Sequence, residues 1–195
     1  RLSQKQFHLV IEFMKGTSAT GIGPQTFANF WTPSTLRGIG AMIVADMLLN
    51  NWDRLPVPQL WSNEGNPGNI MIQVPSHSNE SHDASSSSSS SSPSSPSSPT
   101  LIVIDQTITA IRNPNQNRLY LQKVANLVAN PDFDWLPTYF QFFFGLPSPP
   151  TWVVEHVAQG FLEHLNWIKS NVEELKEMVR ESRQEAEDIV LVKSG

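Results

Sequence analysis

Three polar side chains, those of Asp53, Asn69 and Asp105, have the chemical types and the order along the chain that a phosphoryl-transfer site requires. Such a site needs an acid that orients and deprotonates the acceptor hydroxyl, and oxygen ligands that hold Mg²⁺ at the phosphates. Mg²⁺ usually takes one or two carboxylates together with phosphate oxygens and waters. Each of the three residues stands at the edge of a predicted helix or strand, which favours two carboxylates and one carboxamide in a common site.

A buried helix is predicted to lead into Asp53. Thr32 and Pro33 form a helix start, with Thr as the N-cap and Pro at the first helical position. The residues that follow are apolar at helical spacing on most sides, which is typical of a buried helix over residues 33–49. Asp46 lies inside this helix, and we expect it to be a structural acid near one helix end.

A predicted β-hairpin carries the other two side chains. Strands at 70–74 and 101–104 follow Asn69 and precede Asp105, respectively. Between them, residues 75–100 are rich in Ser and Pro without an apolar anchor, so we expect this insertion to be disordered. Because closure entropy grows slowly with loop length, such a tract can hang from the tip of the hairpin at little cost.

Each candidate also has an ordinary structural interpretation when it is taken alone. A loop Asp after a helix is commonly a turn residue or a cap, and Gly-Asn before a strand is common turn chemistry. Arg54 could bind an acid or a phosphate of the site, or form a structural salt bridge; the sequence leaves both open. Asn66 is a candidate second polar ligand, although a turn role is favoured.

The composition limits the class of protein. A length of 195 residues fits one domain or one lobe of a larger fold, and a net charge of −5 gives no basic footprint for nucleic acid. There is no Cys, which fits a reducing compartment, and no long uncharged apolar run that would span a membrane. We therefore expect a cytoplasmic protein that binds neither nucleic acid nor the membrane interior.

The remaining pattern predicts a mainly α fold of the α+β class. A buried strand is expected at 7–13. Further helices are expected, in chain order, at 24–30, 119–129, 133–144 and 151–168, with Thr151 as a cap, and a charged, solvated helix at 171–188.

The order of the three candidates matches the protein-kinase pattern. There the catalytic Asp follows a buried helix, an Asn comes later in the same loop, and a metal-binding Asp ends the next hairpin. Two departures stand out here. The gap from Asp53 to Asn69 is longer than in the ordinary kinase loop, and Asp105-Gln106-Thr107 replaces Asp-Phe-Gly.

These departures fit a specific family. The segments Asn50-Asn51-Trp52-Asp53-Arg54-Leu55-Pro56, Gly65-Asn66-Pro67-Gly68-Asn69-Ile70-Met71 and Val103-Ile104-Asp105-Gln106 together resemble the catalytic domain of actin-fragmin kinase. That family consists of atypical protein kinases with likeness to the phosphoinositide kinases. The resemblance runs from about Phe7 to about Ile168.

The resemblance implies a role for each candidate residue. Asp53 would be the catalytic base, and Asn69 and Asp105 would bind Mg²⁺. A hinge formed by Glu12, Phe13 and Met14 would meet the adenine of ATP.

The resemblance also implies a domain organisation. Residues 1–16 would be the hinge strand and the end of an N-lobe, and 17–170 a kinase-like C-lobe with the 75–100 insertion. Residues 171–195 would be a charged C-terminal helix and tail, for which partner binding is an alternative role.

The implied function is that of an ATP-dependent protein serine/threonine kinase that transfers the γ-phosphoryl group of Mg-ATP to a hydroxyl of an actin-like protein. The known substrate of the family is actin, phosphorylated on threonine within the actin–fragmin complex. Only six residues precede Phe7, so most of the N-lobe with its phosphate-binding Lys is expected to be absent from this chain. The alternative is therefore a catalytically silent lobe that acts as a protein-binding module. A lipid or small-molecule kinase is a third candidate, but no basic loop follows Asp105.

Overall fold

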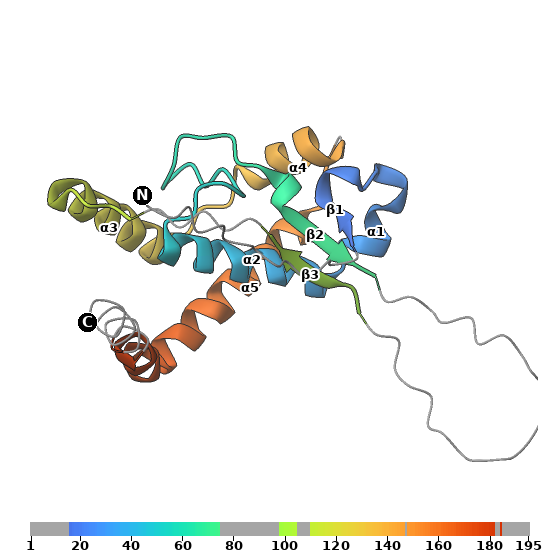
Figure 1. Cartoon of the computed structure of the whole chain (residues 1–195). Coiled ribbons are helices and arrows are strands. Elements are labelled where there is room, and N and C mark those ends of the chain that lie inside the picture. The colour runs from blue at the N-terminus through green and yellow to red at the C-terminus, as the bar shows by residue number, and fades with distance from the viewer. Residues whose placement is uncertain (1–15, 75–97, 105–109, 147, 182–183, 185–195) are drawn as a thin grey trace, which may run out of the picture.

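A computed structural model describes residues 16–74, 98–104, 110–146, 148–181 and 184. This part of the chain is mainly helical with one small antiparallel sheet (Figure 1). The elements, in chain order, are β1 (Thr17–Ser18), η1 (Ala19–Gly21), η2 (Pro24–Thr26), α1 (Phe27–Phe30), α2 (Pro33–Leu49), η3 (Pro67–Asn69), β2 (Ile70–Gln73), β3 (Thr100–Val103), α3 (Pro114–Ala129), α4 (Leu136–Phe144) and α5 (Thr151–Ser170). The expected strand at 7–13 and the Ser/Pro tract lie outside the described residues, apart from its three last positions.

The central helix α2 forms as the sequence predicts. The Thr32 side chain accepts a hydrogen bond from the Thr35 amide at 3.3 Å, and Pro33 occupies the first turn. At the other end Asn50 adopts a left-handed conformation with φ of 50°, which a short polar side chain tolerates. This turn ends the helix and directs the chain toward Asp53.

The predicted hairpin is confirmed. β2 and β3 pair antiparallel, from Ile70 opposite Val103 to Gln73 opposite Thr100. The sheet has a third strand, because Thr17 and Ser18 pair with β2, although small polar residues like those at 17–23 are typical of a loop. A two-residue strand is too short for a recognisable alternation, so only its tertiary pairing reveals it.

We predict that the tract at the hairpin tip contributes little to stability, because the paired register is complete without residues 75–97. Replacing these residues with a three-residue Gly-Ser-Gly link should change the free energy of unfolding by about 1 kcal/mol or less. Urea unfolding measures this, and a Gly/Ser tract of the original length separates the effect of length from that of sequence. A loss above about 2 kcal/mol in both variants would contradict the prediction.

Three later helices are confirmed, two of them with shifted starts. α3 begins at Pro114, because the Asn113 side chain accepts hydrogen bonds from the Asn115 and Gln116 amides at 2.9 and 3.2 Å. α4 begins at Leu136, three residues later than predicted. The expectation that Thr151 caps α5 is wrong: Pro150 holds the N-cap position, and no side chain caps this end.

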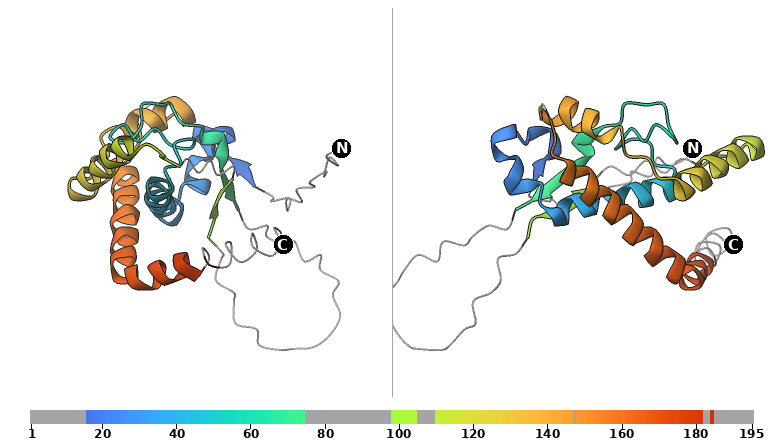
Figure 2. Two further views of the ribbon diagram at one scale, coloured as in Figure 1. Left: turned by 60° about the vertical axis from the view of Figure 1, so that its left-hand side comes forward. Right: turned by 180° about the vertical axis from the view of Figure 1, so that it is seen from behind.

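The helix α5 packs across α2 (Figure 2). Gly40 and Gly160 lie at this crossing, where a Cβ on Gly40 would come within 2.1 Å of the Val157 carbonyl oxygen. The two backbones therefore approach one another with no room for a methyl group. β3 lies against α2 as well, so α2 supports both the hairpin and α5.

Beyond α5 the chain turns at Asn171 and is helical again over residues 172–181 (Figure 2). The charges of this segment are spaced for pairing along a helix, at Glu177/Arg180 and Arg183/Glu187. The first pair is present at 2.7 Å, whereas the second lies outside the described residues. Such exposed pairs contribute about 0.5 kcal/mol or less. Within the described chain, no helix has the length and apolar character to cross a bilayer.

Candidate active site

The structure brings Asp53 and Asn69 together. The Asn69 side-chain amide donates a hydrogen bond to the Asp53 carboxylate at 2.9 Å, across 16 positions of sequence. Asp53 follows α2 in a loop and is half-buried, whereas Asn69 ends η3, is buried, and directly precedes β2. A carboxylate and a carboxamide thus meet where a helix end and a strand start converge.

Asn51 fixes the loop that carries Asp53. Its side-chain oxygen accepts a hydrogen bond from the Asp53 amide at 3.3 Å, and its side-chain nitrogen donates to Asp46 at 3.0 Å. The Asn51 amide also donates to the Asp46 carbonyl at 2.8 Å. Asn51 is part of the sequence motif, but the sequence assigns it no role. Only the structure shows that its side chain is fully buried and holds the loop.

Asp46 and Arg54 form a buried salt bridge, which answers the question that the sequence left open for Arg54. Both side chains are 2% exposed. Burial raises the pKa of Asp46 to about 6, against the lowering effect of the Arg54 charge and of hydrogen bonds from Asn51 and Arg54. Arg54 is therefore a structural cation beneath the loop, and the expected structural role of Asp46 fits this pairing.

Arg54 also contacts the end of the hairpin. Its Nε and one terminal nitrogen both lie 3.4 Å from the Ile104 carbonyl oxygen as donors. The Ile104 amide donates to the Asn69 carbonyl at 3.0 Å. The residue that precedes Asp105 is thus held by both the Asp53 loop and Asn69. Asp105 itself lies outside the described residues.

Asn66 has the favoured turn role. Its side-chain oxygen accepts a hydrogen bond from the Gly68 amide at 3.1 Å, and its backbone amide donates to the Arg54 carbonyl at 3.1 Å. Its side-chain nitrogen also donates to the Asn69 side-chain oxygen at 3.3 Å. Asn66 therefore orients the Asn69 carboxamide, a positioning contact that sequence reasoning missed.

Helix α3 makes hydrogen bonds to backbone on either side of Asp53 in sequence. The Tyr120 hydroxyl donates to the Met47 carbonyl at 2.6 Å, and the Lys123 ammonium donates to the Leu60 carbonyl at 3.2 Å. Burial raises the pKa of Tyr120 to about 12, so its hydroxyl remains a donor at neutral pH. These two bonds attach α3 to the last turn of α2 and to the segment at Leu60 that follows Asp53.

The donor chemistry of the site fits Mg²⁺. Asn69 offers a carboxamide oxygen, and the nearby Asp53 offers a carboxylate, both hard oxygen donors of the kind that Mg²⁺ takes. The described residues contain no cluster of three His, Cys, Asp or Glu side chains that could hold a metal alone. A Mg²⁺ ion bound at Asp53 and Asn69 would therefore need further oxygen donors. Glu12, Phe13 and Met14, the expected adenine hinge, also lie outside the described residues.

The class of protein follows from comparison with known families, and it is a kinase catalytic domain. The catalytic domain of actin-fragmin kinase matches residues 2–138, and the chain belongs to this family. The match covers α2, the Asp53 loop and the hairpin and ends within α4, whereas the resemblance was expected to reach Ile168. No curated protein matches the sequence.

Proposed function

We propose that this chain carries the catalytic lobe of an ATP-dependent protein serine/threonine kinase that phosphorylates an actin-like protein. The observation that supports this most is the 2.9 Å contact between Asp53 and Asn69, with the end of β3 hydrogen-bonded to Asn69. Membership of a kinase catalytic family agrees with it.

In this proposal Asp53 is the catalytic base. It accepts the proton of the acceptor hydroxyl as that oxygen attacks the γ-phosphorus and the bond to ADP breaks. The hydrogen bond from Asn69 holds one carboxylate oxygen in place, which leaves the other to accept the proton. Asn69 and Asp105 would hold Mg²⁺, which when bound neutralises charge on the phosphates.

The experiment combines ATP binding and phosphoryl transfer in the protein that contains this chain. We expect micromolar binding of Mg-ATP by calorimetry and transfer of labelled phosphate to actin, tested both free and bound to fragmin. The variant Asp53→Asn should retain Mg-ATP binding and lose about 10²-fold to 10⁴-fold in transfer rate. Asp105→Ala should lose both.

The control variant is Glu174→Gln, which removes one exposed carboxylate from the C-terminal helix. It should behave as the wild type in both assays. Undiminished transfer in Asp105→Ala would refute the assignment.

A second candidate is a catalytically silent, protein-binding lobe. The observation that favours it is that Arg54, the cation nearest the Asp53 loop in sequence, pairs with Asp46 rather than facing a phosphate. This candidate predicts no Mg-ATP binding under the same calorimetric conditions, so one titration separates the two functions.

A further inference from the structure

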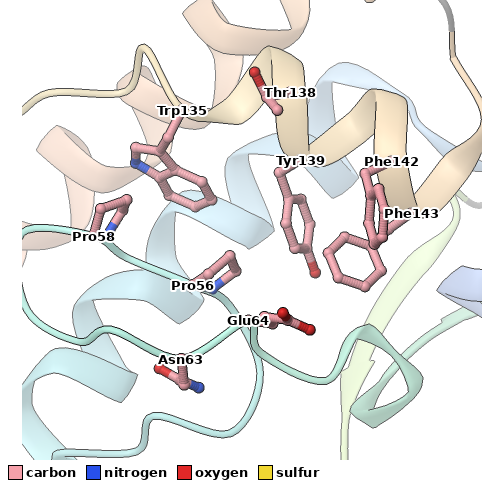
Figure 3. A pocket seen from close by; sticks show the side chains of 9 residues that line it. All are labelled: Pro56, Pro58, Asn63, Glu64, Trp135, Thr138, Tyr139, Phe142 and Phe143. Carbon is pink, nitrogen blue, oxygen red and sulfur yellow. The ribbon is translucent and has the colours of Figure 1, made fainter.

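A cavity of about 460 Å³ opens between the Asp53–Asn69 loop and helix α4 (Figure 3). The loop side contributes Pro56, Pro58, Asn63 and Glu64, and the helix side contributes Trp135, Thr138, Tyr139, Phe142 and Phe143. Its volume is in the range of small-ligand pockets, enough for one long side chain with adjoining backbone.

The cavity wall combines aromatic rings with polar atoms that lack partners. The indole nitrogen of Trp135, the hydroxyl of Tyr139 and the side-chain oxygen of Asn63 are buried and make no hydrogen bond within the described residues. Tyr139 is 4% exposed as a residue, and in Figure 3 its hydroxyl points toward the part of the cavity where Glu64 lies. Buried polar groups are rarely left unsatisfied, so these atoms are available to bind a polar group that enters the cavity.

The charge of the residues that line the cavity indicates the chemical class of its ligand. Glu64 is the one charged residue among the nine that line it. Its side chain is exposed and makes no hydrogen bond or ion pair with other described residues. Apolar, aromatic walls with a single carboxylate fit a cation on an aliphatic stem.

We propose that this cavity binds an arginine side chain of a protein partner. The guanidinium group is planar, stacks on aromatic rings, and has five N–H donors for the oxygens of Glu64, Asn63 and Tyr139. The Trp135 indole N–H is itself a donor, and a backbone carbonyl of the same peptide can satisfy it. Because Pro56 and Glu64 lie in the loop between Asp53 and Asn69, the bound segment would be part of the acceptor; this last step rests on the proposed kinase function.

The test is a titration of the isotope-labelled protein with two short peptides, acetyl-Gly-Arg-Gly-amide and the same peptide with citrulline. Citrulline has the shape of arginine without its charge. The readout is the indole N–H signal of Trp135, one of six Trp, assigned by its loss in Trp135→Phe. No ATP is present, so the result does not depend on kinase activity.

The arginine peptide should shift the Trp135 signal saturably and bind at least about threefold more tightly than the citrulline peptide. Glu64→Gln should remove this difference, while the control Glu174→Gln, which removes a carboxylate that does not line the cavity, should keep it. Equal binding of the two peptides would show a merely apolar groove and overturn the proposal, as would an unmoved Trp135 signal. A positive titration with no phosphoryl transfer would refute the kinase function alone.

Discussion

Replacing Arg54 by Met should lower the free energy of unfolding at pH 8 by about 3–5 kcal/mol. The substitution leaves Asp46 without its counter-ion at a site where the residues are only 1–2% exposed. An unpaired buried carboxylate is costly because it has lost its hydration and gains no compensating charge. In a domain of this size the midpoint of thermal unfolding should fall by about 10 °C.

The deficit of Arg54→Met should be smaller at pH 5 than at pH 8. The pKa of Asp46 is about 6 in the folded chain, above its ordinary 3.8, so the folded state holds this proton more tightly than the unfolded state. The stability that this proton contributes is full below the ordinary pKa and is lost as the pH rises through about 6. Without Arg54 the pKa of Asp46 in the folded chain rises further, so this stability is lost at a higher pH in the variant than in the wild type. Urea unfolding of both proteins at pH 5 and pH 8 measures the deficit.

Two further variants make this test decisive. Arg118→Met removes an exposed cation from α3 and should change stability by about 0.5 kcal/mol or less. The double variant Asp46→Leu/Arg54→Met replaces the ion pair by apolar groups and should recover most of the lost stability. It should not recover all of it, because the contact of Arg54 with the Ile104 carbonyl is still missing. The same loss in Arg54→Met and Arg118→Met would show that the buried pair is unimportant.

The second large effect is expected at the crossing of α2 and α5. A methyl group on Gly160 would lie 2.1 Å from the Arg37 carbonyl oxygen and 2.5 Å from the Arg37 Cα. Both are backbone atoms, so no side-chain movement relieves the overlap and the helices must separate. Gly160→Ala should therefore cost about 3 kcal/mol, although Ala is intrinsically better than Gly in a helix by about 1 kcal/mol.

The matched control is Gly38→Ala in α2. Its added methyl group would meet the end of the Leu101 side chain at 3.2 Å, which can move aside. This variant should be within about 1 kcal/mol of the wild type. Chemical unfolding of the two variants side by side checks the prediction, and equal stabilities would mean that the helices do not cross as closely as described.

Local sequence determined the elements that the site is built on. Helix α2 was predictable at both ends, because its N-cap Thr32 and its apolar periodicity are local signals of residues adjacent in sequence. The hairpin was predictable because two β-rich runs flank a tract rich in Ser and Pro without an apolar anchor. The start of α3 was readable too: Asn113-Pro114 is a cap followed by a helix-starting Pro, the same signal as Thr32-Pro33, and it was overlooked.

The family and its three motifs also followed from the sequence, because the order of the motifs along the chain is a one-dimensional property. The match over residues 2–138 confirms the family. The roles of Asp53, Asn69 and Asp105 remain predictions, and the variants Asp53→Asn and Asp105→Ala test two of them.

Only the tertiary structure decided what these side chains touch. Asp53 and Asn69 are 16 residues apart, and their contact depends on how the intervening loop returns to the helix end. The choice of Asp46 as the partner of Arg54 depends on the left-handed turn at Asn50, which folds the chain back over the last turn of α2. Sequence order specifies which groups are available, but contacts between distant residues depend on backbone path and burial, which only the packed chain fixes.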